Sequence, residues 1–228
     1  MSLGSTPAAY LFDAGGVLVL PDPTVLGPLL RVFGADPDHE THRRAHYAGM
    51  AAKSRARADE HDWAVYDRAY VEMIGVPAHD VDEAAMVLGH TRTPYLWRFP
   101  IDESVAALRD MARRGEAIGV VSNASGQVEA ALRRAAVCQV GGGPGAPVRC
   151  VIDSFLVGVA KPDPSIFEHA LVHLDGIDRS EIAYIGDSVT MDVEGAAAAG
   201  LRPILLDPFD DHPGLGVERI RSLAELVT

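Results

Sequence analysis

AYLFDAGGVL, residues 9–18, is the stretch that decides the fold. Its apolar run leads to one carboxylate, Asp13, and then to the glycines Gly15 and Gly16 before the chain turns apolar again. A short apolar run bounded by a glycine pair is typical of a buried parallel strand, and open α/β sheets bind ligands at the carboxyl ends of their strands. An aspartate before glycines is also a common turn former. The role of Asp13 therefore depends on what later stretches bring to the same edge.

Three later stretches carry polar residues at the corresponding place. The apolar run AIGVV leads to Ser122 and Asn123, VAKPDP contains Lys161, and AYIGDSVTMD contains Asp187 and Asp192. Strand patterns alternate with helical ones here, which predicts a right-handed, doubly wound parallel α/β sheet. The strands of such a sheet end at one edge, so we expect these side chains to lie close to Asp13.

The segment between the first and second of these stretches has a different character. It is rich in Ala, Arg, His, Asp and Glu at helical spacing, which predicts an inserted helical block. We predict a core domain formed by residues 1–20 and 98–228, and a helical cap domain over 21–97 with helices near 25–33, 38–57, 61–74 and 80–90. We also expect residues 141–147, GGGPGAP, to form a flexible surface loop, and a closing helix over residues 217–227.

Composition limits the partners. The formal net charge of −12 and a pI near 5.1 argue against binding to nucleic acid, and no apolar run reaches the ~18 residues of a membrane span. Residues 1–9 lack the basic start and long apolar region of a signal peptide. We therefore expect a cytoplasmic protein, monomeric or homodimeric, that acts on a small molecule. Cys138 and Cys150 are expected to be reduced thiols.

The expected cluster needs a cation. The carboxylates Asp13, Asp187 and Asp192 repel one another unless a positive charge lies among them. A divalent ion resolves this, and Mg²⁺ suits a site of oxygen ligands that retains several waters. Such an ion also lets a carboxylate approach a phosphate group that it would otherwise repel.

In order and combination, these four stretches resemble the four motifs of the haloacid dehalogenase (HAD) superfamily, including a helical cap between the first and the second. The resemblance covers nearly the whole chain and implies a Rossmann-like core and a phosphohydrolase activity on a small phosphorylated metabolite. It implies that Asp13 attacks phosphorus to form an aspartyl-phosphate. Ser122 and Asn123 would hold the phosphoryl oxygens, and Lys161 would neutralise both the nucleophile and the phosphate.

The same resemblance implies a Mg²⁺ site. Asp13 and Asp187 would bind the ion directly, the backbone carbonyl of Gly15 would complete the protein ligands, and Asp192 would orient the ion's waters. Water would then attack the phosphorylated intermediate.

One position departs from the family pattern. Gly15 stands where HAD phosphatases carry a second aspartate that acts as general acid and base, a role worth about 10²- to 10⁴-fold in rate. A phosphatase with this glycine would favour good leaving groups or obtain its proton elsewhere, and Gly15→Asp is expected to raise turnover of alkyl phosphates. Two other enzyme readings stay open, a metal-independent 2-haloacid dehalogenase and a phosphonoacetaldehyde hydrolase-like enzyme that forms a Schiff base through Lys53. A catalytically weak binding protein is the third alternative.

The expected cap contains other residues able to do chemistry. His42 and His46 lie four residues apart, a spacing that can hold a metal, but no third ligand is evident and we expect both at the surface. Lys53 is expected to be a solvated helix residue.

Overall fold

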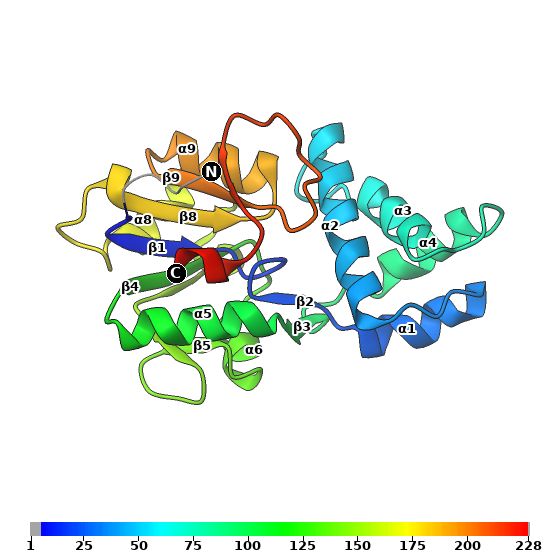
Figure 1. The fold of residues 1–228 in the computed structure, drawn as a ribbon, viewed down its shortest axis with the longest axis horizontal. Coiled ribbons are helices and arrows are strands. Elements are labelled where there is room, and N and C mark those ends of the chain that lie inside the picture. The colour runs from blue at the N-terminus through cyan, green and yellow to red at the C-terminus, as the bar shows by residue number, and fades with distance from the viewer. Residues whose placement is uncertain (1–5, 228) are drawn as a thin grey trace.

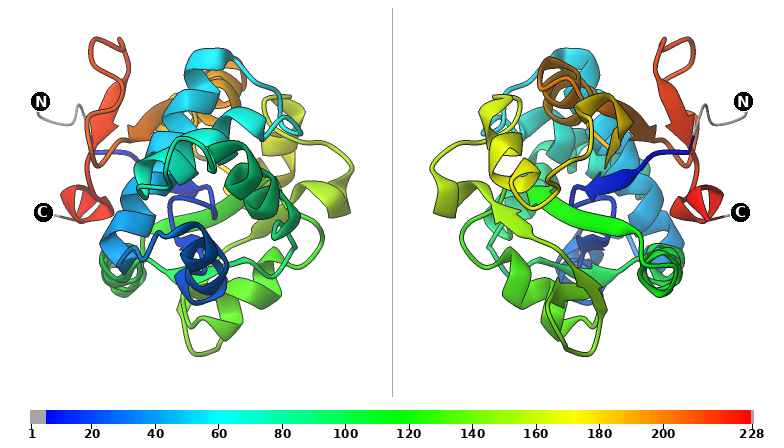
Figure 2. Two further views of the ribbon diagram at one scale, coloured as in Figure 1. Left: turned by 90° about the vertical axis from the view of Figure 1, so that its right-hand side faces the viewer. Right: turned by 90° about the vertical axis from the view of Figure 1, so that its left-hand side faces the viewer.

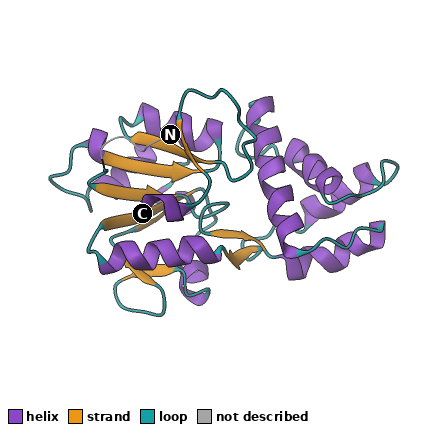
Figure 3. Cartoon of the chain, in the orientation of Figure 1, coloured by secondary structure: helices purple, strands orange, loops and turns teal. Residues whose placement is uncertain are grey.

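The computed structural model describes residues 6–227 and contains a parallel six-stranded sheet with helices on both faces (Figures 1 and 3). The strand order is β10-β9-β8-β1-β4-β7. This confirms the predicted doubly wound α/β fold, and residues 1–5 and 228 of the predicted core lie outside the described part of the chain. The strands are β1 (Ala9–Phe12), β4 (Ala117–Ser122), β7 (Val151–Asp153), β8 (Ile182–Gly186), β9 (Arg202–Leu206) and β10 (Glu218–Ile220).

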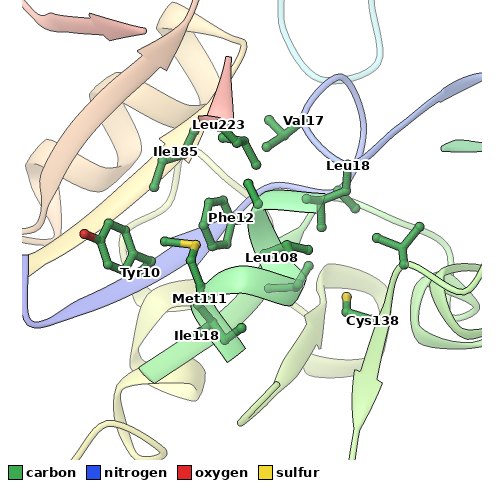
Figure 4. Close-up of a cluster of buried hydrophobic side chains, with 14 of the residues drawn as sticks. Tyr10, Phe12, Val17, Leu18, Leu108, Met111, Ile118, Cys138, Ile185 and Leu223 are labelled. Atoms are coloured by element: carbon green, nitrogen blue, oxygen red, sulfur yellow. The ribbon is translucent and has the colours of Figure 1, made fainter. Parts of the chain in front are cut away.

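The central strand β1 is buried on both faces because its side chains alternate between two hydrophobic clusters. Tyr10 and Phe12 pack with one cluster (Figure 4), and Ala9 and Leu11 pack with the other. The helices that cover the first face are α5 (Asp102–Arg113) and α6 (Val128–Arg134). Those on the second are α8 (Ser165–Leu171) and α9 (Glu194–Ala198). A shorter helix, α7 (Ser154–Val157), follows β7.

A group of helices with a hydrophobic cluster of its own stands beyond the ends of the strands (Figures 1 and 2). The chain enters it through β2 (Val19–Pro21) and leaves it through β3 (Trp97–Pro100), which pair antiparallel. Both predicted domain boundaries fall within this strand pair. We call the helices between β2 and β3 the cap; they are α1 (Pro23–Leu30), α2 (His39–Ala56), α3 (Ala64–Met73) and α4 (Val81–His90). Short 3₁₀ turns occur at Arg31–Phe33 and Arg179–Glu181.

One local prediction is wrong and a second is right only in part. The predicted helix over 217–227 is instead strand β10 followed by a 3₁₀ turn, Leu223–Leu226, because the chain adds an edge strand beside β9 before Ser222 caps the turn. The predicted loop 141–147 ends in a strand, because β6 (Ala146–Val148) pairs with β5 (Cys138–Val140). Within residues 6–227, helices fall short of the length and apolarity that crossing a membrane requires.

Candidate active site

The structure brings the predicted site residues to one cavity at the carboxyl edge of the sheet. Asp13 follows β1, Ser122 ends β4, and Asp187 follows β8. Lys161 reaches the same cavity from the loop before α8. The cavity has a volume of about 410 Å³, and Gly15, Asn123 and Asp192 also line it. We call the part of its lining that comes from the sheet edge the floor, and the part that comes from the cap the wall.

A buried ion-pair network forms the centre of the floor. The ammonium nitrogen of Lys161 lies 3.0 Å from an Asp13 carboxylate oxygen and 2.7 Å from one of Asp192. It also donates to the Tyr184 hydroxyl at 2.7 Å. Burial opposes the charge of Lys161, but Asp13 and Asp192 raise its pKa above the usual value. The ammonium thus stays protonated between two carboxylates.

Asp13 combines burial with access to the cavity. Its side chain is 14% exposed, whereas those of Lys161 and Asp192 are 2% exposed. Burial raises the pKa of Asp13 above its usual value, the ammonium of Lys161 opposes that rise, and the nearby carboxylates add to it. A carboxylate that is held by a lysine and open to a cavity is suited to nucleophilic attack.

The donor set of the floor fits a divalent cation. One ligand oxygen from each of Asp13, Asp187 and Asp192 lies within 4.8 Å of the others. An all-oxygen set of this kind matches the ligands that Mg²⁺ prefers. Asp192 already has donors on both oxygens, since Oδ1 binds Lys161 and Tyr184 and Oδ2 accepts the Ser188 N–H. This leaves Asp13 and Asp187 as the carboxylates more available to an ion.

Residue 16 must be a glycine because the Asp187 carboxylate lies close against its backbone. Its φ of +71° lies in the left-handed region that favours glycine. A Cβ atom at this position would overlap the Asp187 carboxylate and come within 2.6 Å of the His46 ring. The second glycine of the AYLFDAGGVL stretch therefore makes room for the carboxylate that follows β8.

Asn123 ties two parts of the floor together. Its Oδ1 accepts the Lys161 backbone N–H at 2.8 Å, and its Nδ2 donates to the Lys161 carbonyl at 3.0 Å. The same Nδ2 donates to the carboxylate of Glu60, on the wall, at 2.9 Å. Ser122, beside it, is buried. The side-chain amide of Asn123 thus holds the backbone at Lys161 in place and hydrogen-bonds Glu60 of the wall.

The wall also reaches the candidate metal ligands, and the expectation that His42 and His46 lie at the surface is wrong. His46, which is 1% exposed, places Nε2 3.0 Å from an Asp187 oxygen, and its Nδ1 hydrogen-bonds the Tyr66 hydroxyl. His42 is buried against Tyr70 within the cap. Both residues face inward because α2 lies on the floor and on α3 at the same time.

Lys53 is also buried, so the expectation of a solvated residue is wrong. It is 2% exposed, lines the cavity, and lies with its ammonium 3.9 Å from the centre of the Trp63 ring. The same ammonium donates to the backbone carbonyl of Glu60 at 3.0 Å. Burial lowers the pKa of Lys53 from its usual value.

The space above Gly15 is filled by an aromatic ring. A Cβ atom at this position would lie 3.2 Å from Trp97, whose ring packs edge-on against His46. An aspartate at residue 15 would require that ring to move. The gain in turnover expected for Gly15→Asp from the sequence therefore no longer follows.

Sequence reasoning missed His46 and Glu60 as parts of the site. One signal was present for His46, because His42, His46, Gly49 and Lys53 recur at helical spacing and all face inward on α2. Gly49 belongs to this pattern because the Tyr66 ring occupies the place of its Cβ. Glu60 had no such signal, since it lies in the loop between α2 and α3.

Comparison with known proteins agrees with this geometry. The family model for haloacid dehalogenase-like hydrolases matches residues 7–200. This chain belongs to that family. The match includes every residue that the sequence placed on the floor, and it spans the cap as well.

Relatives within the HAD family include several phosphatases. The phosphoserine phosphatase of Thermus thermophilus is 35% identical over 111 residues, which are 48% of this chain and 42% of that protein. The chain thus spans less than half the length of that relative. The ribulose-1,5-bisphosphate 5-phosphatase of Halopiger xanaduensis is 26% identical over 185 residues, 78% of this chain and 73% of that protein.

Solved structures show the same fold. The HAD-hydrolase YfnB of Bacillus subtilis, solved bound to magnesium, aligns with a TM-score of 0.58 at 17% identity over 97% of each chain. A HAD phosphatase of Thermococcus onnurineus aligns with a TM-score of 0.56 at 21% identity, over 96% of this chain and 95% of that one.

Proposed function

We propose that this protein is a Mg²⁺-dependent phosphohydrolase of a small phosphorylated metabolite and that it acts through an aspartyl-phosphate on Asp13. The observation that supports this most is the contact of the Lys161 ammonium with Asp13 at 3.0 Å and with Asp192 at 2.7 Å. Asp187 lies in the same carboxylate cluster. Phosphatase relatives in the HAD family support the same reaction.

In the first step, an Asp13 carboxylate oxygen attacks phosphorus, and the bond from phosphorus to the leaving oxygen breaks. Lys161 reduces the repulsion between the carboxylate and the anionic phosphoryl group, because its ammonium already contacts Asp13. Ser122 would bind the phosphoryl oxygens through its hydroxyl group and Asn123 through its backbone N–H, because the side-chain amide of Asn123 already donates to Lys161 and Glu60. Together these residues orient the phosphoryl group in line with Asp13.

Asp13, Asp187 and the Gly15 carbonyl would hold Mg²⁺, with Asp192 orienting its waters. The ion supplies positive charge that offsets the repulsion between the carboxylates and the phosphoryl group. Asp192 also positions Lys161 directly, through the 2.7 Å contact.

In the second step, water attacks the phosphorus of the aspartyl-phosphate. The bond between phosphorus and the Asp13 oxygen breaks, which releases inorganic phosphate and restores the carboxylate. A proton must leave the attacking water in this step, and an alkoxide leaving group must gain one in the first. Gly15 has no side chain to perform either transfer.

The test is phosphate release from p-nitrophenyl phosphate with and without Mg²⁺, together with halide release from a 2-haloacid. We expect phosphate release that requires Mg²⁺ and disappears in Asp13→Asn. Halide release without metal would replace this proposal with the dehalogenase reading, and no release in either assay would favour a binding protein.

Cleavage of a carbon–phosphorus bond is the second candidate, and the burial of Lys53 favours it. A Schiff base requires a neutral amine, and burial lowers the pKa of Lys53. The amine would condense with a substrate carbonyl and release water. Borohydride reduction in the presence of phosphonoacetaldehyde would then fix the substrate carbon skeleton to Lys53, a product visible by peptide mass spectrometry. Full phosphatase activity without any trapped adduct would exclude this candidate.

A further inference from the structure

The proposed function leaves the proton donor for the leaving group unassigned, and the wall offers one carboxyl group. Glu60 lies in the cap loop between α2 and α3, and its side chain reaches across the cavity to Asn123. Its Oε2 accepts the Asn123 amide N–H at 2.9 Å. Because Asn123 follows Ser122 at the end of β4, this contact brings the Glu60 carboxyl group to the place where the phosphoryl group would be held.

Most other titratable residues of the cavity already have partners that make them less suited to transfer this proton. Within residues 6–227, Asp13, Lys161 and Asp192 bind one another on the floor. Both ring nitrogens of His46 already have partners, Tyr66 and Asp187. Arg92 is paired with Asp67, and an arginine does not release its proton in proteins.

Glu60 has a free oxygen with which to transfer a proton. Among the hydrogen bonds of the described residues, Asn123 binds Oε2 and nothing binds Oε1. A carboxyl group anchored through one oxygen has a defined position, and its second oxygen can exchange a proton with a reacting group. This is the arrangement that general acid–base catalysis needs.

The loop that carries Glu60 is held in place from two sides. Lys53 donates to the Glu60 backbone carbonyl at 3.0 Å and lies over the Trp63 ring. Asp59 accepts the backbone N–H groups of His61 and Asp62 at 2.8 and 2.9 Å. These contacts fix the backbone on either side of Glu60, so the position of its carboxyl group does not depend on the Asn123 contact alone.

We propose that Glu60 is the general acid and base that replaces the missing side chain at residue 15, an inference that rests on the proposed phosphohydrolase function. In the first step the protonated Glu60 gives its proton to the leaving oxygen as the bond from phosphorus to that oxygen breaks. In the second step the Glu60 carboxylate takes a proton from the water that attacks phosphorus. The bond to Asp13 breaks, and both residues return to their starting states.

The test compares Glu60→Gln on two substrates in single-turnover experiments with the Mg²⁺-loaded enzyme. p-Nitrophenolate leaves without a proton, so its release should change by less than about threefold, whereas phosphorylation by an alkyl phosphate should slow by about 10²-fold or more. Hydrolysis of the intermediate should also slow, because its general base is gone. Steady-state release of p-nitrophenol should therefore begin with a burst of one equivalent per site.

Two control variants belong to this experiment. Asp62→Asn makes the same carboxyl-to-amide change at an exposed position of the same loop. It should not change the rate of reaction with either substrate. His61→Gln removes the neighbouring titratable group of the cavity lining. Gln at residue 60 can still accept the Asn123 N–H, so an unchanged thermal unfolding midpoint should accompany the loss of activity.

Equal slowing of both substrates by Glu60→Gln, without a burst, would overturn the assignment. The assignment would also be overturned if His61→Gln, and not Glu60→Gln, lost activity specifically toward alkyl phosphates. If the wild-type enzyme releases phosphate from neither substrate, the proposed function itself is contradicted. That outcome differs from a variant that loses activity only toward alkyl phosphates.

Discussion

The floor and the wall of the cavity are organised differently. The polar groups of the floor bind one another, as Lys161 does with Asp13 and Asp192. Two polar groups of the wall bind the floor instead, as His46 does with Asp187 and Glu60 with Asn123. In the proposed mechanism the floor holds the nucleophile Asp13 and the charged groups beside it, whereas the groups of the wall are positioned by the contact between the cap and the sheet edge. Variants of the two regions should fail in different ways.

The largest effect is expected on the floor. Asp13→Asn removes the nucleophile, and its activity should fall on the order of 10⁴-fold or more for every substrate. The fold should survive, because asparagine occupies nearly the same volume and Lys161 keeps Asp192 as its partner. Phosphate release measured beside a thermal unfolding curve checks this. Substantial residual turnover would show that another group attacks the substrate.

An intermediate effect is expected where the wall meets the floor. His46→Gln removes the imidazole that orients Asp187, and partners of metal ligands typically contribute 10- to 100-fold in metal affinity. We expect calorimetry to show Mg²⁺ binding weakened by about tenfold. His42→Gln is the matched control, since His42 lies one turn away on the same helix and binds Tyr70. Equal losses in both variants would mean that His46 contributes only to the packing of the cap.

The smallest effect is expected within the cap, away from the floor. Burial lowers the pKa of His42 to about 4, His39 adds to this and Asp38 opposes it. The unfolded chain binds this proton near pH 6.5 and the folded chain only near pH 4, so stability falls as the pH drops between these values. Between pH 7.5 and 4.5, wild type should lose about 1–2 kcal/mol more than His42→Gln in urea unfolding. Identical pH dependence in the two proteins would contradict this.

The same difference between the two regions explains what the sequence could predict. Most floor residues lie at or soon after the end of an apolar strand, so their neighbours in the chain locate them, and parallel pairing brings the strand ends together. The inward face of α2 gave only a weaker signal in the sequence, namely the spacing of His42, His46 and Lys53. That spacing alone does not show which face of a helix meets the core. Surface and solvated positions were therefore predicted where the structure has buried ones.

Glu60 and Trp97 could not be predicted from local patterns. Glu60 reaches Asn123 across 63 positions of sequence, and Trp97 covers Gly15 from the far end of the cap insertion. Both contacts exist only because the cap closes on the sheet edge. The predicted closing helix failed for a related reason, since the pairing of β10 with β9 depends on a neighbouring strand and not on the helical spacing of residues 217–227.

Covalent labelling of the nucleophile tests the central claim most directly. The Mg²⁺-loaded enzyme would be mixed with p-nitrophenyl phosphate, quenched in acid during turnover and digested for tandem mass spectrometry. We expect one added phosphoryl group on Asp13, at higher occupancy in Glu60→Gln because hydrolysis of the intermediate is slowed. A phosphoryl group on another residue, or steady turnover with Asp13 never modified, would contradict that claim.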